Sequence, residues 1–529
     1  MRFLVHHMLQ QSAERFPERQ AIVDGDQSLS FSDLANSSQQ LGSALVQFGL
    51  NRGDRVAIQL PPSHHLVESI LASSFADGVF VPIHHSLFPD QVEHILSDSG
   101  AKVFITDAAR YDRFLGQKSQ LPVAHAIVKD CKGEFGQRVT PWQSISSIAA
   151  AYSLKPSCSI ENDLAAILYT SGSTGKPKGV MLSHANILAG AKIVSEYLGI
   201  TDQDRILAAL PLSFDAGLNQ LTTSLLQGAT LAMIDFKFGR DIVKILEQQN
   251  ITGLAGVPSL WSLLAQPSSG MRKAHLPDLR YITNTGGALS RKVLDTLRTS
   301  LPNTDVVLMY GLTEAFRSTY LPPQHLDQHP DSMGIAIPNT EILVINEDGG
   351  LCEPEEVGEL VHRGPTVSLG YWGQPEKTRQ VLRPNPLREF QGHITDELVC
   401  YSGDLVRRDK DGFLYFVGRR DNQIKSSGFR ISPTEVEEVL CTIASVEQAA
   451  VVGAPDENLG QHLVAFVIAA QEDCSLSEIQ SVCAKLLPRH MIPKRIINLD
   501  RLPLTSNGKV DYPALRTQAL PDELSKDAV

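Results

Sequence analysis

Short apolar segments alternate with longer amphipathic segments through the first part of the chain. The apolar segments have the length of strands, and the amphipathic ones have the spacing of helices. Up to residue 160, the apolar segments lie at 21–23, 55–60, 79–83 and 101–105. Helical patterns at 31–48, 64–76 and 91–99 separate them. This alternation predicts a mostly parallel sheet covered by helices.

The same rhythm recurs between residues 163 and 309. The second set of strand segments lies at 165–169, 205–209, 230–233, 253–257 and 280–284. We therefore predict two similar α/β subdomains, which meet near residue 160.

The pattern changes at about residue 341. Strand segments at 341–346, 358–363, 397–402 and 413–417 are separated by Gly, Pro and Asp turns, which predicts a small β-barrel. From residue 421 a mixed pattern predicts a compact α+β unit of normal domain size. The predicted fold is therefore α/β: an N-terminal domain (1–420) with two α/β subdomains and a β-barrel, then a small mobile C-terminal domain (421–529).

Composition narrows the classes of function. The 529 residues are too many for one core, and a net charge of −12 argues against a nucleic-acid partner. The seven cysteines include no C-x-x-C pair, which favours free thiols in a reducing compartment. No apolar run is long enough to cross a bilayer, so we expect no membrane partner and a cytoplasmic protein.

The run Ser-Gly-Ser-Thr-Gly-Lys-Pro-Lys-Gly at 171–179 is the most informative segment. Glycines let backbone N–H groups approach a ligand, hydroxyls donate hydrogen bonds, and lysines supply positive charge. Pro177 stands where the common phosphate loop has Ser or Thr after its lysine, so this loop is of another kind. A flexible linker is the alternative, but linkers rarely adjoin a buried strand.

With its flanks this run reads YTSGSTGKPKGV, which resembles the signature of the AMP-forming adenylate enzymes. That superfamily includes acyl-CoA synthetases, adenylation domains of peptide synthetases, and luciferases. Four further motifs resemble the family's in the same order: YGLTE at 310–314, YSGD at 401–404, GRRD at 418–421 and NGK at 507–509. The resemblance implies that a carboxylate attacks the α-phosphate of ATP, and that a thiol then displaces AMP from the acyl-adenylate.

The resemblance also implies the cofactors and the ATP site. ATP and Mg²⁺ are expected, with the thiol of CoA or of phosphopantetheine as acceptor. The residues expected to bind ATP are Thr170, Ser171, Gly172, Ser173, Thr174, Gly175, Lys178, Gly286, Gly287, Ala288, Tyr310, Gly311, Thr313, Asp404 and Arg419. The loop would wrap the β- and γ-phosphates, and residues 286–288 would leave room for adenine, with Tyr310 stacked on it. Asp404 would accept the ribose hydroxyls, unless it only forms a turn.

Three residues are expected to be catalytic: Lys178, Glu314 and Lys509. Glu314 offers a hard oxygen ligand for magnesium, and its alternative role is to cap a helix. Lys509 would follow a tight Asn-Gly turn and bridge the substrate carboxylate and the α-phosphate, unless it is a solvated hairpin lysine. By the same resemblance, Asp421 is the expected hinge and Gly428 marks the face that approaches the thiol acceptor.

Asp215 is the residue that discriminates best between acid substrates. Amino-acid-activating relatives carry an Asp here that pairs with the substrate ammonium, and a buried carboxylate calls for such a cation. The rival interpretation is that Asp215 caps the helix predicted at 217–227. The expected acid-binding residues are Phe214, Asp215, Asn219, Thr285, Met309 and Arg317, with Ala255, Thr283 and Ser318 as further lining. Arg317 meets either a second anionic group or, as slightly favoured, a surface carboxylate.

These residues predict an AMP-forming ligase for a small carboxylic acid, either an amino acid or another polar acid. CoA or a carrier protein would accept the acyl group, and the carrier is expected to be a separate chain because no carrier motif follows Lys509. The alternative is a general acyl-CoA synthetase for aliphatic acids. No residue excludes a luciferase-like oxygenase.

Overall fold

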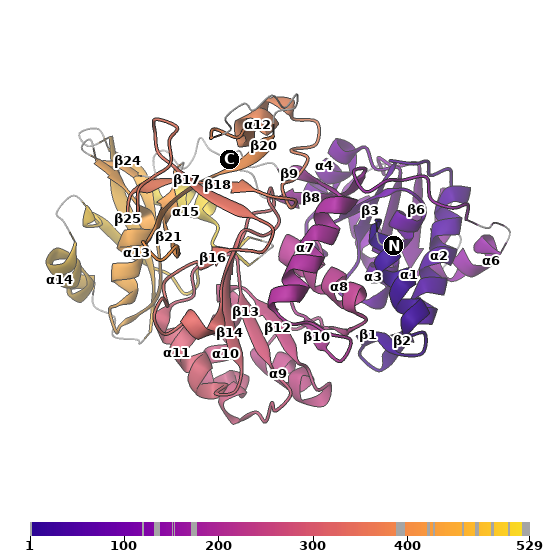
Figure 1. Cartoon of the computed structure of the whole chain (residues 1–529), viewed down its shortest axis with the longest axis horizontal. Coiled ribbons are helices and arrows are strands. Elements are labelled where there is room, and N and C mark those ends of the chain that lie inside the picture. Colours follow the sequence, from indigo (N-terminus) through magenta and orange to yellow (C-terminus); the bar gives the residue numbers. More distant parts are fainter. Residues whose placement is uncertain are drawn as a thin grey trace.

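The structure is a computed structural model. It describes residues 3–118, 121–131, 138–150, 152, 154–170, 177–387, 397–420, 424–426, 429–456, 460–470, 476–487, 491–505 and 508–520. These residues form two large sheets with helices beside them, a smaller antiparallel sheet and a C-terminal α+β unit (Figure 1).

The first large sheet has seven strands in the order β7-β6-β5-β3-β4-β8-β9. Its strands are β3 (Arg55–Gln59), β4 (Val79–Pro82), β5 (Val103–Asp107), β6 (His125–Lys129), β7 (Val139–Pro141), β8 (Leu164–Thr170) and β9 (Lys178–Ser183). All neighbours are parallel except β8 and β9. The helices of this region are α2 (Phe31–Gln47), α3 (His64–Phe75), α4 (Pro89–Ser99), α5 (Ala108–Gln117) and α6 (Ile145–Ala149).

The second large sheet has nine strands in the order β16-β15-β14-β13-β12-β10-β11-β1-β2. Its strands are β1 (Gln20–Asp24), β2 (Gln27–Ser30), β10 (Arg205–Ala208), β11 (Thr230–Met233), β12 (Gly253–Gly256), β13 (Tyr281–Asn284), β14 (Asp305–Tyr310), β15 (Thr319–Leu321) and β16 (Ile335–Ala336). Its helices are α7 (His184–Tyr197), α8 (Asp215–Gln227), α9 (Gly239–Gln248), α10 (Pro258–Ala265) and α11 (Arg291–Ser300). In this order, neighbouring strands are parallel from β14 through β13, β12, β10 and β11 to β1, as the sequence pattern predicts.

The predicted division of the two subdomains near residue 160 is wrong. Strand β1, from the start of the chain, pairs with β11 in the second sheet, whereas β8 pairs with β4 in the first. An apolar pattern identifies a strand but carries no information on its partner. The sequence alone therefore does not show that β1 belongs to the second sheet and β8 to the first.

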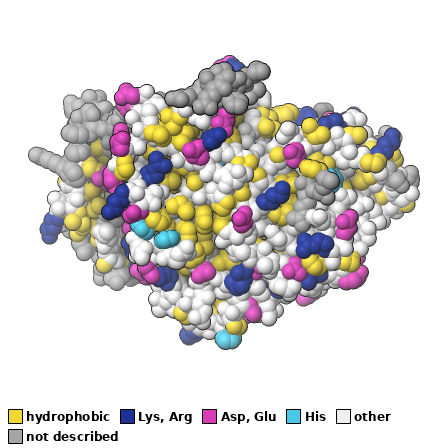
Figure 2. Space-filling model, viewed as in Figure 1, with side chains coloured by type: hydrophobic (Ala, Val, Ile, Leu, Met, Phe, Trp, Pro, Cys, Tyr) yellow, Lys and Arg dark blue, Asp and Glu magenta, His cyan; other side chains and the backbone are white. Residues whose placement is uncertain are grey.

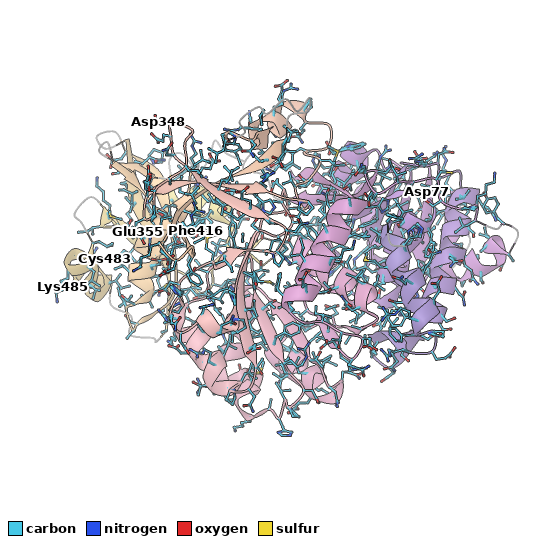
Figure 3. All side chains as sticks on the ribbon, viewed as in Figure 1. Asp77, Asp348, Glu355, Phe416, Cys483 and Lys485 are labelled. Carbon is cyan, nitrogen blue, oxygen red and sulfur yellow. The ribbon has the colours of Figure 1, made fainter. Side chains whose placement is uncertain are left out.

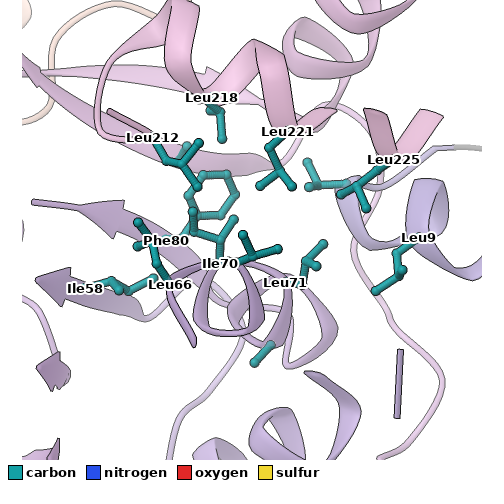
Figure 4. Packing of buried hydrophobic residues seen from close by; sticks show 14 of the residues in the cluster. Leu9, Ile58, Leu66, Ile70, Leu71, Phe80, Leu212, Leu218, Leu221 and Leu225 are labelled. Atoms are coloured by element: carbon teal, nitrogen blue, oxygen red, sulfur yellow. The ribbon is translucent and has the colours of Figure 1, made fainter. Parts of the chain in front are cut away.

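Helices from both regions pack into one core between the two large sheets. Helix α1 (Val5–Arg15) and the buried faces of α3 and α8 belong to the same hydrophobic cluster. Leu218, Leu221 and Leu225 of α8 point toward Ile70 and Leu71 of α3 (Figure 4). Every residue of α8 from 215 to 226 is buried, so this helix holds its first residue, Asp215, inside the protein.

The predicted β-barrel is a five-stranded antiparallel unit. It comprises β17 (Glu341–Ile345), β18 (Val357–Arg363), β19 (Leu382–Pro384), β20 (Leu398–Arg408) and β21 (Leu414–Arg419), with α12 (Pro375–Val381) beside it. The long strand β20 pairs with β18, β19 and β21. It carries Asp404 in its middle.

The C-terminal unit has its own sheet and its own core. It comprises β22 (Ile424–Ser426), β23 (Phe429–Ile431), α13 (Pro433–Cys441), β24 (Val446–Asp456), β25 (Gly460–Ala469), α14 (Leu476–Leu486), β26 (Arg495–Asn498) and α15 (Tyr512–Ala519). Cys483 and Lys485 mark α14 at the opposite end of the molecule from Asp77 (Figure 3). The predicted boundary at 420/421 stays a prediction, because Asp421 lies outside the described residues.

The surface and the helices add two observations. On the face drawn in Figure 2, Lys and Arg side chains are scattered among Asp and Glu. Within the described ranges, no helix is both long and apolar enough to cross a membrane.

Glu437 makes the stability of the C-terminal unit depend on pH. Its partly buried carboxyl accepts hydrogen bonds from Val451 N at 2.7 Å and from the Tyr512 hydroxyl at 3.0 Å. Burial raises the pKa of Glu437 from 4.5 to about 7. Because the folded-state pKa is the higher one, the stability from this group is complete below pH 4.5 and is lost as the pH rises through 7.

We therefore expect the melting temperature of the wild type to fall relative to that of Glu437→Gln across this window. The slope corresponds to at most about 1.4 kcal/mol of unfolding free energy per pH unit. Thermal melts of both proteins at a series of pH values measure it. Parallel pH profiles would show that Glu437 does not titrate in this way.

Candidate active site

The predicted phosphate loop connects two antiparallel strands of the first sheet. Thr170 ends β8 and pairs with Lys178, which begins β9. The Thr170 hydroxyl is buried at the end of β8 and has no hydrogen-bond partner among the described residues. Ser171, Gly172, Ser173, Thr174 and Gly175 lie outside the described residues. Thr170 and Lys178 thus fix both ends of the loop.

Lys178 and Glu314 meet through Tyr371, a residue that the sequence analysis missed. Lys178 Nζ donates to the Tyr371 hydroxyl at 2.6 Å, and that hydroxyl donates to Glu314 Oε1 at 2.5 Å. Lys178 Nζ also lies 3.4 Å from Glu314 Oε1. Burial and the Glu314 carboxylate raise the pKa of the Tyr371 phenol, so it remains a donor. Tyr371 reaches the site through a bridge to Val180, which no local pattern indicates.

Glu314 does not cap a helix. It lies in a turn after β14, and no helix of the described residues begins there. Gly311 and the buried Thr313 precede it in the same turn. Its carboxylate belongs with the phosphate loop, because its contacts are to Lys178 and Tyr371.

The segment proposed to hold adenine follows β13. Gly286 has φ of +82°, in the left-handed region, and Gly287 and Ala288 are exposed. Asn284 Nδ2 donates to Gly287 O at 2.9 Å and fixes the turn. The segment presents backbone and small side chains, with Thr285 buried beneath it.

Tyr310, Asp404 and Arg419 form a second polar cluster. The Tyr310 hydroxyl donates to Asp404 Oδ2, and Arg419 NH1 lies 3.0 Å from Asp404 Oδ1. Ser402 Oγ accepts the Asp404 N–H at 3.0 Å, so the hydroxyl at position 402 shapes the turn. The structure thus brings together the three residues expected to hold the ribose and adenine.

Lys509 comes from the C-terminal unit and reaches the second sheet. Its turn includes Gly508, with φ of +76°, and Ser259 Oγ donates to Gly508 O at 3.0 Å. Lys509 Nζ lies 5.4 Å from the centre of the Phe214 ring. A methyl group on Gly286 would lie 3.1 Å from Lys509 Cε. The lysine side chain therefore lies beside Phe214 and the adenine segment, although the residue is exposed. Asp421 and Gly428 lie outside the described residues.

The six predicted acid-binding residues are all buried, and Lys509 lies beside one of them, Phe214. Phe214 is the N-cap of α8, and Asp215, the first residue of the helix, accepts the N–H of Ala216 at 2.7 Å. Asp215 and Asn219 are each 3% exposed, which places them on the buried face one turn apart. Met309 of β14 accepts a hydrogen bond from the Tyr197 hydroxyl at 2.8 Å.

The slightly favoured prediction for Arg317 is wrong. Arg317 is 2% exposed, so it does not pair with a surface carboxylate. The preceding residue, Phe316, has φ of +59° and is fully buried. This left-handed backbone, rare for a bulky residue, turns the chain so that position 317 enters the core.

Gly190 of α7 makes room for Phe316. A methyl group on Gly190 would lie 2.4 Å from Phe316 Cδ1. We expect Gly190→Ala to lower the unfolding free energy by about 1–3 kcal/mol through overpacking, and to raise the KM for the acid by displacing Arg317. Thermal melting and steady-state kinetics measure the two effects.

Gly116→Ala is the matched control, because Gly116 also lies in a helix but has nothing within 4 Å of an added methyl group. That change should leave stability unaltered or raise it by about 0.5–1 kcal/mol. Equal melting temperatures for the two variants would contradict the proposed packing of Phe316.

Comparison with known proteins agrees with this geometry. Residues 9–372 match the family model described as AMP-binding enzyme, and residues 435–509 match the AMP-binding enzyme C-terminal domain. Tyrocidine synthase 1 of Brevibacillus parabrevis is 30% identical over 518 residues, which are 97% of this chain and 44% of the relative. Delta-poly-L-ornithine synthetase of Acinetobacter baumannii is 30% identical over 516 residues, 96% of this chain and 36% of the relative. The chain thus spans less than half the length of these relatives.

Solved structures resemble the whole chain. The o-succinylbenzoate CoA synthetase of Bacillus subtilis, in complex with its acyl-adenylate, is 26% identical with a TM-score of 0.80 and 97% of each chain covered. A benzoate CoA ligase from Burkholderia xenovorans is 25% identical with a TM-score of 0.84, covering 97% of this chain and all of the other.

The chain has the fold of these ligases, with a large N-terminal and a small C-terminal domain. The chain belongs to the AMP-binding enzyme family. The resemblance found in the sequence motifs is thereby confirmed.

Proposed function

We propose that this chain activates a small amino acid or other polar acid as an acyl-adenylate and transfers it to a thiol. The thiol belongs to CoA or to a carrier protein. The proposal rests chiefly on one observation: Lys509 of the C-terminal unit lies against Phe214, and the next residue is the buried carboxylate Asp215. A cation for the reacting centre and an anion for the substrate are thereby adjacent.

The first step brings an anionic carboxylate against a polyanion, so catalysis depends on charge and position. A carboxylate oxygen attacks the α-phosphorus, and pyrophosphate leaves. Lys509 would neutralise charge between the two reactants, Lys178 would bind departing phosphate oxygens, and Asp404 would hold the ribose. In the second step the thiolate attacks the acyl carbon, and AMP leaves with the bridging oxygen.

Glu314 fits a magnesium ligand, since among the described residues Tyr371 and Lys178 approach its carboxylate at Oε1 and leave Oε2 available. Magnesium usually takes one or two protein carboxylates together with substrate phosphates. When bound, the ion would offset charge on the leaving pyrophosphate. Tyr371 would orient Glu314 toward it by donating to Oε1.

The polar lining weighs against the aliphatic alternative. Asn219 Nδ2 and Thr283 Oγ1 are buried without hydrogen-bond partners among the described residues, and a hydrocarbon chain would leave both unsatisfied. We also propose a cytoplasmic location, supported by the free thiols at 131, 158, 352, 400, 441 and 483.

Acid-dependent exchange of labelled pyrophosphate into ATP tests the proposal. The panel would hold amino acids, dicarboxylic acids, aryl acids and short and long aliphatic acids. We expect exchange to be strongest with a small polar acid and to require magnesium. Strongest exchange with a long aliphatic acid would favour the alternative, and no exchange with any acid would contradict the proposed function.

A further inference from the structure

Two of the predicted acid-binding residues, Asp215 and Arg317, carry opposite charges and are buried. Asp215 is 3% exposed and Arg317 is 2% exposed. Among the described residues, no ion pair joins them or links either to a third group. Burial raises the pKa of the Asp215 carboxyl, and the positive charges of Arg317 and Lys509 oppose this shift.

Arg317 is held in place by its backbone, while part of its guanidinium lacks a partner. Arg317 N donates to Ala315 O at 2.7 Å, and the adjacent Ser318 N donates to Tyr310 O at 3.1 Å. Arg317 Nε is buried and has no hydrogen-bond partner in the part of the chain that the structure describes. A buried guanidinium is costly unless an anion and hydrogen bonds compensate it, so its position calls for an anionic ligand.

Asp215 is a buried carboxylate that requires a cationic partner. Among the described residues, its carboxylate accepts one hydrogen bond, from Ala216 N within its own helix. The N-terminus of α8 favours the ionised carboxylate, but no described cation lies within ion-pair distance of it. A ligand ammonium would supply the missing partner.

The geometry points to an amino dicarboxylic acid as the substrate, an inference that rests on the proposed function. The substrate ammonium would bind Asp215, one carboxylate would bind Arg317, and the other would face Lys509 as the reacting group. Each buried charge then meets an opposite charge. The planar guanidinium suits bidentate binding of a carboxylate.

Two sets of acids of equal chain length separate the effect of the substrate ammonium from that of its second carboxylate. The first quartet has five carbons: glutamate carries both extra groups, norvaline only the ammonium, glutarate only the second carboxylate, and valerate neither. The second quartet has four carbons: aspartate, 2-aminobutyrate, succinate and butyrate. In the quartet of the correct length, we expect kcat/KM for pyrophosphate exchange to be at least about tenfold higher for the doubly charged acid than for either singly charged one.

Variants of Arg317 and Asp215 test which residue binds the second carboxylate of the substrate and which binds its ammonium. Arg317→Gln should lower kcat/KM about 10- to 100-fold for the two dicarboxylic acids and change it less than about threefold for the two monocarboxylic acids. Asp215→Asn should do the same for the two amino acids and spare the acids without an amine. Arg317→Lys keeps the charge and should retain part of the preference for dicarboxylic acids.

Three results would overturn the inference. The first is a wild-type preference for norvaline or 2-aminobutyrate, and the second is a preference for an acid outside both quartets. The third is a drop in kcat/KM that is equal for all four acids in Arg317→Gln and comes with a lowered melting temperature. All three leave the proposed ligase function intact. Absence of exchange with every acid would instead contradict the proposed function itself.

Discussion

Lys509→Ala is expected to lower the rate of adenylate formation by about 10²–10³-fold or more, because one preorganised charge at the reacting centre is removed. Thioester formation from supplied acyl-adenylate should stay within a few-fold of the wild-type rate, since no charge then moves between carboxylate and phosphate. Pyrophosphate exchange measures the first half-reaction, and thioester release from synthetic acyl-adenylate measures the second.

Lys494→Ala is the control for this experiment. Lys494 belongs to the same C-terminal unit, but it is 53% exposed and pairs with Asp456. Its loss should affect neither half-reaction. Equal impairment of both half-reactions in Lys509→Ala would contradict a role confined to adenylation.

Glu314→Gln is expected to slow adenylation about 10²-fold and to raise the magnesium concentration needed for half-maximal rate. The amide keeps the size of the side chain but loses the charge that would bind the ion. Tyr371→Phe, which removes only the hydroxyl that donates to Glu314, should have a smaller effect in the same direction.

Magnesium titrations of the three proteins separate a metal ligand from a structural residue. A purely structural role would lower the maximal rate and the melting temperature without shifting the magnesium dependence. An unchanged magnesium midpoint in Glu314→Gln would therefore contradict the assignment.

Local sequence patterns predicted the strands, the helices and the positions of several site residues. The loop after β8 and the turn before Lys509 could be located because Gly, Ser and Asn-Gly have strong backbone preferences. Thr170 and Lys178 do lie at the two ends of that loop, and Tyr310, Asp404 and Arg419 do meet.

Contacts between distant segments could not be predicted in this way. Lys178 and Tyr371 are 193 positions apart, and β1 pairs with a strand that begins at Thr230. The burial of Arg317 depends on the left-handed backbone of Phe316 and on the space that Gly190 of helix α7 leaves for the Phe316 ring. A single sequence shows none of these pairings, because each follows from how whole elements pack.

The fate of a carboxylate oxygen tests the central claim most directly. The enzyme would be incubated with ATP, CoA or a carrier thiol, and the acid most active in exchange, labelled with ¹⁸O in its carboxyl group. Attack of that carboxylate on the α-phosphorus, followed by thiol displacement, predicts one ¹⁸O atom in AMP and none in the pyrophosphate. Label in inorganic phosphate, with ADP as the other product, would contradict an acyl-adenylate and with it the account of this site.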